Sequence, residues 1–128
     1  MPDLNKILYV EDDPDIQTVA QMALETIGGF ELKVCSSGDE AMVEASDFGP
    51  DLILLDVQMP GMDGPTTMKA LREKPDFFET PVVFMTAKVM PSDIEGYRAL
   101  GAADVISKPF DPMTLSDQIR AIWNTCHD

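Results

Sequence analysis

Several acidic and cationic residues stand directly after short apolar runs, at positions where a buried strand would end. Asp56 closes the run LILLD and is followed at once by a loop rich in proline and glycine, while Glu11 and Asp12 follow the run KILYV. Thr86 and Lys108 follow two later runs. Three acids, a hydroxyl and an amine gathered at one place would suit the binding of a divalent cation and the transfer of a phosphoryl group.

The acids set the chemistry. In a tight cleft the carboxylates of Glu11, Asp12 and Asp56 would repel one another unless a divalent cation lay among them. An all-oxygen site with few protein ligands suits Mg2+, which usually accompanies phosphate groups. With the acids neutralised, the Asp56 carboxylate can act as a nucleophile and accept a phosphoryl group as an aspartyl phosphate.

The remaining residues of the cluster fit the same chemistry. Lys108 would neutralise phosphoryl oxygens, and Thr86 would donate a hydrogen bond to them. Backbone N–H groups after Asp56 and after Thr86, the latter belonging to Ala87, would complete a cradle for the phosphoryl group. Pro109 follows Lys108, and an X-Pro bond is the one place where a cis peptide costs little. Pro109 is therefore the candidate for a cis peptide that turns the lysine into the cleft.

These residues need a scaffold of alternating strands and helices. Short apolar or β-branched runs predict five strands, at residues 6–10, 31–35, 52–56, 81–85 and 103–107. A helix-start signal follows each strand: Asp13-Pro14, the capping box of Ser37 and Glu40, Gly64-Pro65, Met90-Pro91 and Asp111-Pro112. Such alternation with short connections predicts a three-layer α/β sandwich around a parallel sheet. The carboxyl ends of its strands then meet at one edge, where ligand sites form.

The composition argues against several other classes of protein. The chain has 128 residues, 45% of them hydrophobic, which suits one domain over residues 1–128. Its formal net charge of -14, from 23 acidic against 9 basic residues, argues against direct binding to nucleic acid or anionic lipid.

Sequence signals for location and for other sites are few. No apolar run approaches the roughly 20 residues of a membrane-spanning helix, and no leader pattern opens the chain, so we expect a cytoplasmic protein without a membrane partner. Cys35 and Cys126 lack metal-site spacing, and neither a disulfide nor a zinc site is predicted. His127, the only histidine, lies in the tail and is not expected to act in catalysis.

Four segments of the chain resemble the signature blocks of the response-regulator receiver domain of two-component signalling. They are ILYVEDDPDI, LILLDVQMPGMDG, VVFMTAK and GAADVISKPFDP, and they occur in the right order over the whole chain. The resemblance implies a flavodoxin-like fold, with a five-stranded parallel sheet in the order 2-1-3-4-5 and five helices. It makes Asp56 the phosphoacceptor, Thr86 the switch hydroxyl and Lys108 the lysine of the family pattern. It implies a magnesium site made by Glu11, Asp12, Asp56 and the backbone carbonyl of Gln58.

The resemblance also implies partners. A sensor histidine kinase or a histidine-phosphotransfer protein would supply the phosphoryl group from a phosphohistidine. Because the last helix runs nearly to the end of the chain, we expect a stand-alone receiver. It would signal either by binding a downstream protein, whose identity the sequence does not indicate, or by passing the phosphoryl group onward. The only catalysis expected is of its own phosphorylation and dephosphorylation.

Some positions depart from the family pattern or qualify it. Glu11 has one methylene more than the aspartate of many relatives, and it can still reach a metal directly or through water. Val105 replaces the aromatic residue usual three positions before the lysine, so a relay through a rotating ring is not expected. Gln58 and Lys88 flank the path of an attacking water, and we expect them to tune the lifetime of the phosphoryl group.

Two other functions fit parts of the pattern. A haloacid-dehalogenase-type phosphatase also uses a strand-end aspartate as its nucleophile, but it has a second aspartate two residues later as acid and base. Gln58 occupies that position here, so turnover of small phosphate esters is not expected. A non-phosphorylated pseudo-receiver would serve only as an interaction module. A missing acid, threonine or lysine would favour that reading, and all are present.

Overall fold

One parallel sheet forms the centre of the protein, in a computed structural model that describes residues 3–126. Its strands are β1 (Lys6–Val10), β2 (Glu31–Cys35), β3 (Leu52–Asp56), β4 (Val82–Thr86) and β5 (Asp104–Ser107). The strand order is β2-β1-β3-β4-β5, and every neighbouring pair is parallel. The predicted strands are confirmed, with β4 shifted by one residue toward Thr86 and β5 starting one residue later.

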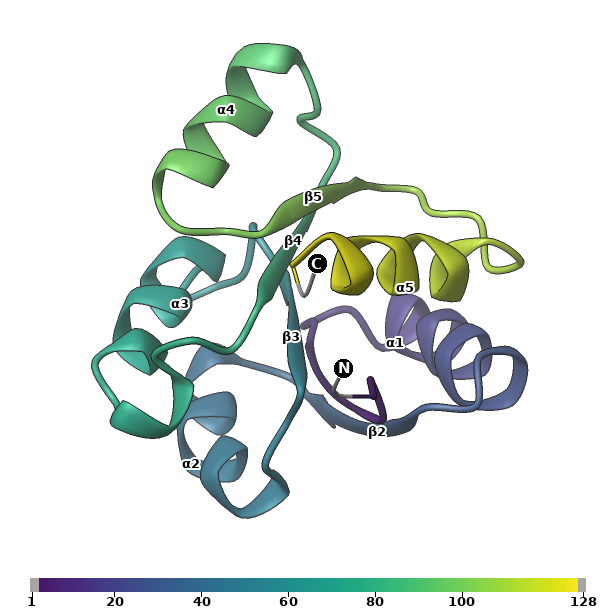
Figure 1. The fold of residues 1–128 in the computed structure, drawn as a ribbon, viewed down its shortest axis with the longest axis horizontal. Coiled ribbons are helices and arrows are strands. Elements are labelled where there is room, and N and C mark those ends of the chain that lie inside the picture. The colour runs from purple at the N-terminus through teal and green to yellow at the C-terminus, as the bar shows by residue number, and fades with distance from the viewer. Residues whose placement is uncertain (1–2, 127–128) are drawn as a thin grey trace.

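Helices cover both faces of this sheet, as the sequence predicted. They are α1 (Pro14–Gln21), α2 (Gly38–Phe48), α3 (Gly64–Arg72), α4 (Pro91–Ala99) and α5 (Leu115–Cys126). In Figure 1, α1 and α5 lie on one side of the sheet, α2 and α3 lie on the other, and α4 stands beyond β5 at the top. The flavodoxin-like sandwich with five helices is confirmed. A π-helical segment (Met22–Ile27) extends α1, and a short 3-10 helix (Pro75–Phe77) precedes β4.

Alternate residues of the central strands pack into two cores. Tyr9, Leu54 and Met85 point to the α1 and α5 side, where they meet Leu115 and Ile119. The intervening residues of the same strands pack on the side of α2 and α3. Strands that are covered on both faces are apolar throughout, which is why they are read easily from the sequence. A polar residue at the end of such a strand is held by a rigid element and faces the edge of the sheet.

The helix starts follow the predicted chemistry with two differences. The Asp13 carboxylate caps α1 by accepting a hydrogen bond from the N–H of Asp15 at 2.9 Å. Ser37 caps α2 in the same way, but the Glu40 carboxylate accepts from the N–H of Ser36 at 2.8 Å, one residue before the expected partner. The start of the last helix at Asp111-Pro112 was predicted wrongly.

In the last connection, the Asp111 carboxylate accepts the N–H of Met113 at 2.9 Å and closes a turn. Helix α5 therefore begins three residues after Pro112, at Leu115. An Asx turn and a helix N-cap use the same aspartate oxygen, so the sequence signal is shared by both structures.

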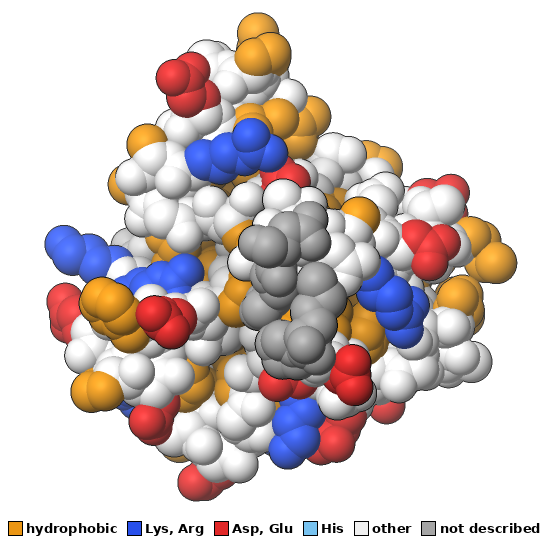
Figure 2. All heavy atoms as spheres, viewed as in Figure 1, with side chains coloured by type: hydrophobic (Ala, Val, Ile, Leu, Met, Phe, Trp, Pro, Cys, Tyr) orange, Lys and Arg blue, Asp and Glu red, His pale blue; other side chains and the backbone are white. Residues whose placement is uncertain are grey.

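The surface is charged and mixed. On the face in Figure 2, acidic side chains are interspersed with basic and apolar ones. Over residues 3–126, no helix is both long enough and apolar enough to cross a membrane. Cys35 is buried, Cys126 is exposed, and both are free thiols. His127 lies outside the described residues.

Candidate functional site

The carboxyl ends of β1, β3, β4 and β5 bring the predicted site residues together at one edge of the sheet. A cavity of about 230 Å³ opens there. It is lined by Glu11, Asp12, Asp13, Ile16, Asp56, Gln58, Thr86, Ala87 and Lys108. Residues that are up to 97 positions apart in the sequence therefore share one small polar cavity.

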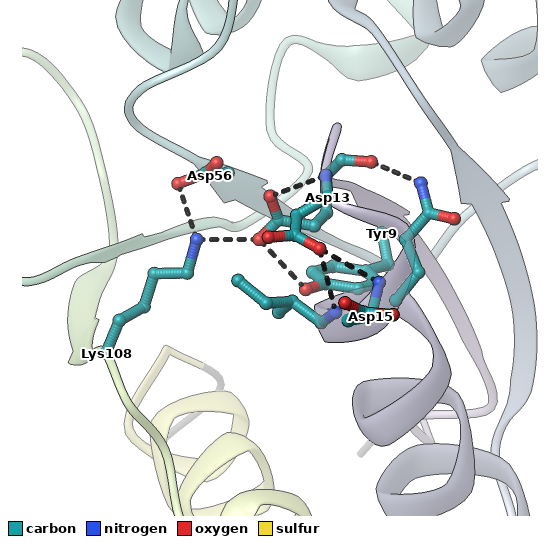
Figure 3. Close-up of polar contacts among 8 residues, drawn as sticks. Tyr9, Asp13, Asp15, Asp56 and Lys108 are labelled. Atoms are coloured by element: carbon teal, nitrogen blue, oxygen red, sulfur yellow. Dashed lines mark hydrogen bonds and ion pairs between the residues drawn. The ribbon is translucent and has the colours of Figure 1, made fainter.

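Lys108 joins two of the buried acids. Its ammonium nitrogen lies 2.7 Å from Glu11 Oε1 and 3.0 Å from Asp56 Oδ1. Figure 3 shows the Lys108 side chain extending toward Asp56 from the segment that directly follows β5. Glu11 and Asp56 are 1% and 4% exposed. Two nearly dehydrated carboxylates thus share one cation, which offsets much of their mutual repulsion.

The protonation equilibria of this group reflect its burial. Burial raises the pKa of the Glu11 carboxyl, the Asp56 carboxylate adds to that rise, and Lys108 opposes it. Burial also disfavours the charge on Lys108, but its hydrogen bonds to the two carboxylates outweigh this and raise the pKa of the ammonium. The lysine is therefore held as a cation between the Glu11 and Asp56 carboxylates.

Three carboxylates are close enough to share a metal ion. Glu11, Asp12 and Asp56 each offer one oxygen, and these oxygens all lie within 4.8 Å of one another. Asp12 is exposed while the other two are buried, so the site is open on one side. Hard oxygen donors with open coordination positions match the preference of Mg2+, which keeps several of its waters. The residues present therefore fit the predicted metal.

Glu11 is fixed by contacts that the sequence did not suggest. The hydroxyl of Tyr9 donates to Glu11 Oε1 at 3.3 Å, and the N–H of Asp13 donates to Oε2 at 3.3 Å. The Gln17 amide donates to the backbone carbonyl of Glu11. Burial, together with the charge of Glu11, raises the pKa of Tyr9, so its hydroxyl keeps its proton. Tyr9 had been indistinguishable from any other core residue of an apolar strand.

The hydrogen bonds of Thr86 and of the backbone N–H groups around the cavity differ in part from those predicted. Thr86 is buried, and its Oγ1 accepts a hydrogen bond from the N–H of Lys88 at 3.1 Å. The N–H of Val57, directly after Asp56, donates to the Met85 carbonyl at 3.0 Å and belongs to the sheet. Within residues 3–126, the N–H groups of Gln58 and Ala87 have no hydrogen-bond partner. Gln58 and Ala87 both line the cavity, so their amides are the candidate donors for the cradle.

Other candidate positions have distinct surroundings. The Lys108–Pro109 bond, the candidate for a cis peptide, is cis. Lys88 is exposed and does not belong to the cavity lining, and its effect on the phosphoryl lifetime stays a prediction. Val105 is partly buried and packs against the core on the α2 and α3 side.

Comparison with known families agrees with this geometry. Residues 7–120 match the family described as the response regulator receiver domain. The chain is 39% identical over 124 residues to the transcriptional regulatory protein CpxR of Escherichia coli K12, covering 97% of this chain and 51% of CpxR. It is 38% identical over 117 residues to the alkaline phosphatase synthesis transcriptional regulatory protein PhoP of Bacillus subtilis, covering 91% of this chain and 48% of PhoP. The chain thus spans about half the length of these relatives.

Solved structures of similar fold include a chemotaxis protein and a receiver domain from a histidine kinase. The chemotaxis protein CheY4 of Vibrio cholerae superposes with a TM-score of 0.86 at 30% identity, covering 94% of this chain and 99% of that one. The signal receiver domain of a signal transduction histidine kinase from Syntrophus aciditrophicus gives a TM-score of 0.80 at 32% identity, covering 94% and 91%. The predicted fold and the predicted resemblance are both confirmed.

Proposed function

The chain belongs to the response regulator receiver domain family, and from that premise we propose that it is a phosphorylation-dependent signalling switch with Asp56 as its phosphoacceptor. The observation that carries this proposal is the placement of Asp56. Its carboxylate ends β3, is 4% exposed, lies 3.0 Å from the Lys108 ammonium and borders a cavity shared with Thr86. A carboxylate nucleophile needs this combination of restricted solvent access and a nearby cation.

The donor is a phosphohistidine of a sensor histidine kinase or of a histidine-phosphotransfer protein. An Asp56 oxygen forms the new P–O bond as the P–N bond breaks, and the electron pair of that bond stays on the imidazole nitrogen, which is then protonated. Lys108 neutralises charge on the phosphoryl oxygens, and the N–H groups of Gln58 and Ala87 donate to them. Attack of water on the aspartyl phosphate resets the switch. Gln58, which lines the cavity, and Lys88, which is exposed just beyond Ala87, tune the lifetime.

The metal of this reaction is Mg2+. Glu11, Asp12, Asp56 and the backbone carbonyl of Gln58 would hold it. When bound, Mg2+ would neutralise the negative charge of the acids and polarise the phosphoryl group that is transferred. The chain's own part is to keep three carboxylate oxygens within 4.8 Å of one another on rigid strand ends.

An apolar cavity next to the site suits docking of the donor protein. It measures about 530 Å³ and lies between α1 and the connection that follows β5, with Ile16, Val19 and Phe110 in its lining. Lys108 lines both this cavity and the acidic one. A donor domain whose apolar side chains fill the larger cavity would present its phosphohistidine to the smaller one.

The output is a change in binding to another cytoplasmic protein or onward phosphotransfer. The Thr86 hydroxyl moves toward the phosphoryl group and gives up its contact with the N–H of Lys88, so the loop leading to α4 is rearranged. No direct contact with nucleic acid or membrane is part of the proposal, in keeping with the net charge of -14. CpxR and PhoP are described as transcriptional regulators, and this chain matches about half of each.

Intact-mass measurement after incubation with acetyl phosphate and Mg2+ tests the proposal. Wild type should gain one phosphoryl group, Asp56→Asn should gain none, and wild type in EDTA should gain none. The control Asp47→Asn removes an exposed acid of α2 and should behave as wild type. Equal phosphorylation of Asp56→Asn would overturn the assignment. An unmodified wild type would favour a pseudo-receiver, and steady release of phosphate from small esters would favour a phosphatase.

A further inference from the structure

Among residues 3–126, Tyr9 is the one buried hydroxyl that contacts an acid of the candidate metal site without lining the cavity. It lies in β1, fully buried, two residues before Glu11, which directly follows the strand. Its hydroxyl donates to Glu11 Oε1 at 3.3 Å, as Figure 3 shows for the labelled Tyr9. Because Tyr9 is absent from the cavity lining, it can act only through Glu11.

Glu11 Oε1 has two donors with different freedom to move. Lys108 donates at 2.7 Å but also contacts Asp56 at 3.0 Å, so its ammonium is shared with the phosphoacceptor. A phosphoryl group on Asp56 would draw that ammonium away from Glu11. Tyr9 is packed within the sheet among the residues of the α1 and α5 core and cannot follow. It is the donor that stays with Glu11 Oε1 when the lysine leaves.

The remaining contacts of Glu11 hold its backbone and its second oxygen. Its N–H donates to the carbonyl of Cys35 at 3.0 Å, and the Gln17 amide donates to its carbonyl. Oε2 accepts from the N–H of Asp13 at 3.3 Å. With the backbone fixed, the rotation of the longer glutamate side chain is the freedom left, and Tyr9 restricts it from the core side.

We propose that Tyr9 is a positioning residue that holds the Glu11 carboxylate toward Asp12 and Asp56 and thereby sets the affinity for Mg2+. The inference rests on the proposed function, since it takes Mg2+ as the ligand of the three acids. It goes further in assigning part of that affinity to a side chain that touches neither the cation nor the phosphoryl group. The hydroxyl lowers the cost of keeping the buried Glu11 carboxylate turned toward the other two acids before the cation arrives.

The test is Tyr9→Phe, which keeps the ring and removes the hydroxyl. We expect its Kd for Mg2+, measured by isothermal titration calorimetry, to rise about three- to tenfold, the loss of one hydrogen bond to a charged group. The Mg2+ concentration for half-maximal phosphorylation by acetyl phosphate should rise by the same factor. The rate at saturating Mg2+ should change less than about twofold, because Tyr9 does not contact the reacting atoms. A general structural defect would lower that maximal rate as well.

Two further variants isolate the contact. Tyr97→Phe removes the same hydroxyl from the chain's other tyrosine, on α4, and should leave the Kd unchanged. In a Glu11→Gln background, Tyr9→Phe should have little further effect, because the charged acceptor is gone. The inference is overturned if folded Tyr9→Phe binds Mg2+ within twofold of wild type, or if the loss is equally large in the Glu11→Gln background. Failure of wild type to bind Mg2+ would instead remove the metal site of the proposed function, and this inference with it.

Discussion

Helices α4 and α5 follow consecutive strands, yet they are attached to the sheet very differently. Helix α5 buries Leu115, Ser116, Ile119 and Trp123, and the Ser116 hydroxyl donates to the Ala23 carbonyl at 2.9 Å. None of the residues of α4 is buried. Burial of apolar side chains is the main stabilising contribution to helix docking, so α5 is firmly held and α4 is not.

The attachments of α4 are few and lie near its C-terminal end. The Tyr97 ring meets Phe84 edge-on with centroids 5.4 Å apart, and Arg98 pairs with Asp104 at 2.8 Å. Exposed apolar side chains flank the helix, including Met90 and Leu100, and apolar side chains are visible over α4 at the top of Figure 2. A helix with this attachment can shift at small energetic cost, and exposed apolar groups around it suit a binding surface.

The weakly attached helix α4 directly follows the loop that leaves the candidate site. Thr86 ends β4, and α4 begins five residues later at Pro91. The connection between them is tied back by the contact of the Lys88 N–H with Thr86 Oγ1. A movement of the Thr86 hydroxyl would therefore reach α4, the helix that is easiest to move, while α5 would stay docked.

Truncating the same residue type on each helix should give the largest contrast. Ile119 on α5 is fully buried, whereas Ile94 on α4 is only partly buried. We expect Ile119→Ala to lower the free energy of unfolding by about 2–5 kcal/mol, the usual cost of emptying a core site. Ile94→Ala should cost about 1 kcal/mol or less. Urea denaturation of both variants measures the difference, and equal losses would contradict the comparison.

Most of the site was predictable because strand ends are predictable. The runs around Leu54 and Phe84 are apolar on both faces, so their limits, and hence the positions of Asp56 and Thr86, follow from the sequence to within one residue. Parallel pairing then requires these ends to meet at one edge. The convergence of Glu11 and Lys108 on Asp56 needed no information about side-chain rotamers.

The features that the sequence did not predict depend on side-chain rotamers, on sheet register and on residues that can serve two local structures. The Tyr9 contact requires one rotamer of Glu11, which composition and periodicity do not contain. The N–H of Val57 was a natural candidate for the cradle, but the sheet register assigns it to the Met85 carbonyl. The start of α5 was misplaced because the Asp111 carboxylate closes a turn instead of capping the helix.

Hydrogen exchange with a beryllofluoride mimic of the phosphoryl group should show where the signal travels. We expect the largest changes in residues 86–95, because a displaced Thr86 hydroxyl releases the N–H of Lys88 and the start of α4. Smaller changes are expected around Val105, since valine has a single χ angle and too little reach to swing between two positions. Amide exchange followed by mass spectrometry, with and without the mimic, makes the comparison.

Two outcomes of this exchange experiment bear on the comparison of the helices. Asp56→Asn should show no change on addition of the mimic, which ties the effect to the phosphoacceptor. Changes confined to β5 and α5, with an unaltered loop before α4, would show that the docked helix carries the signal. In that case the substitution of Val105 for an aromatic residue has been misread.

The smallest expected effect comes from the ion pair that links α4 to β5. The Arg98 and Asp104 side chains are 56% and 32% exposed, so solvent screens most of their attraction. Arg98→Gln should therefore lower the free energy of unfolding by less than about 0.5 kcal/mol, while amide exchange within α4 speeds up because one of its few attachments is lost.

Arg72→Gln is the matched control on α3. The Arg72 guanidinium donates to the carbonyls of Phe77, Thr80 and Gly101. Its loss leaves several carbonyls without donors and should cost about 1–3 kcal/mol. If Arg98→Gln were as costly as Arg72→Gln in urea denaturation, α4 would be as firmly held as its neighbours, and its role as the movable element would have to be abandoned.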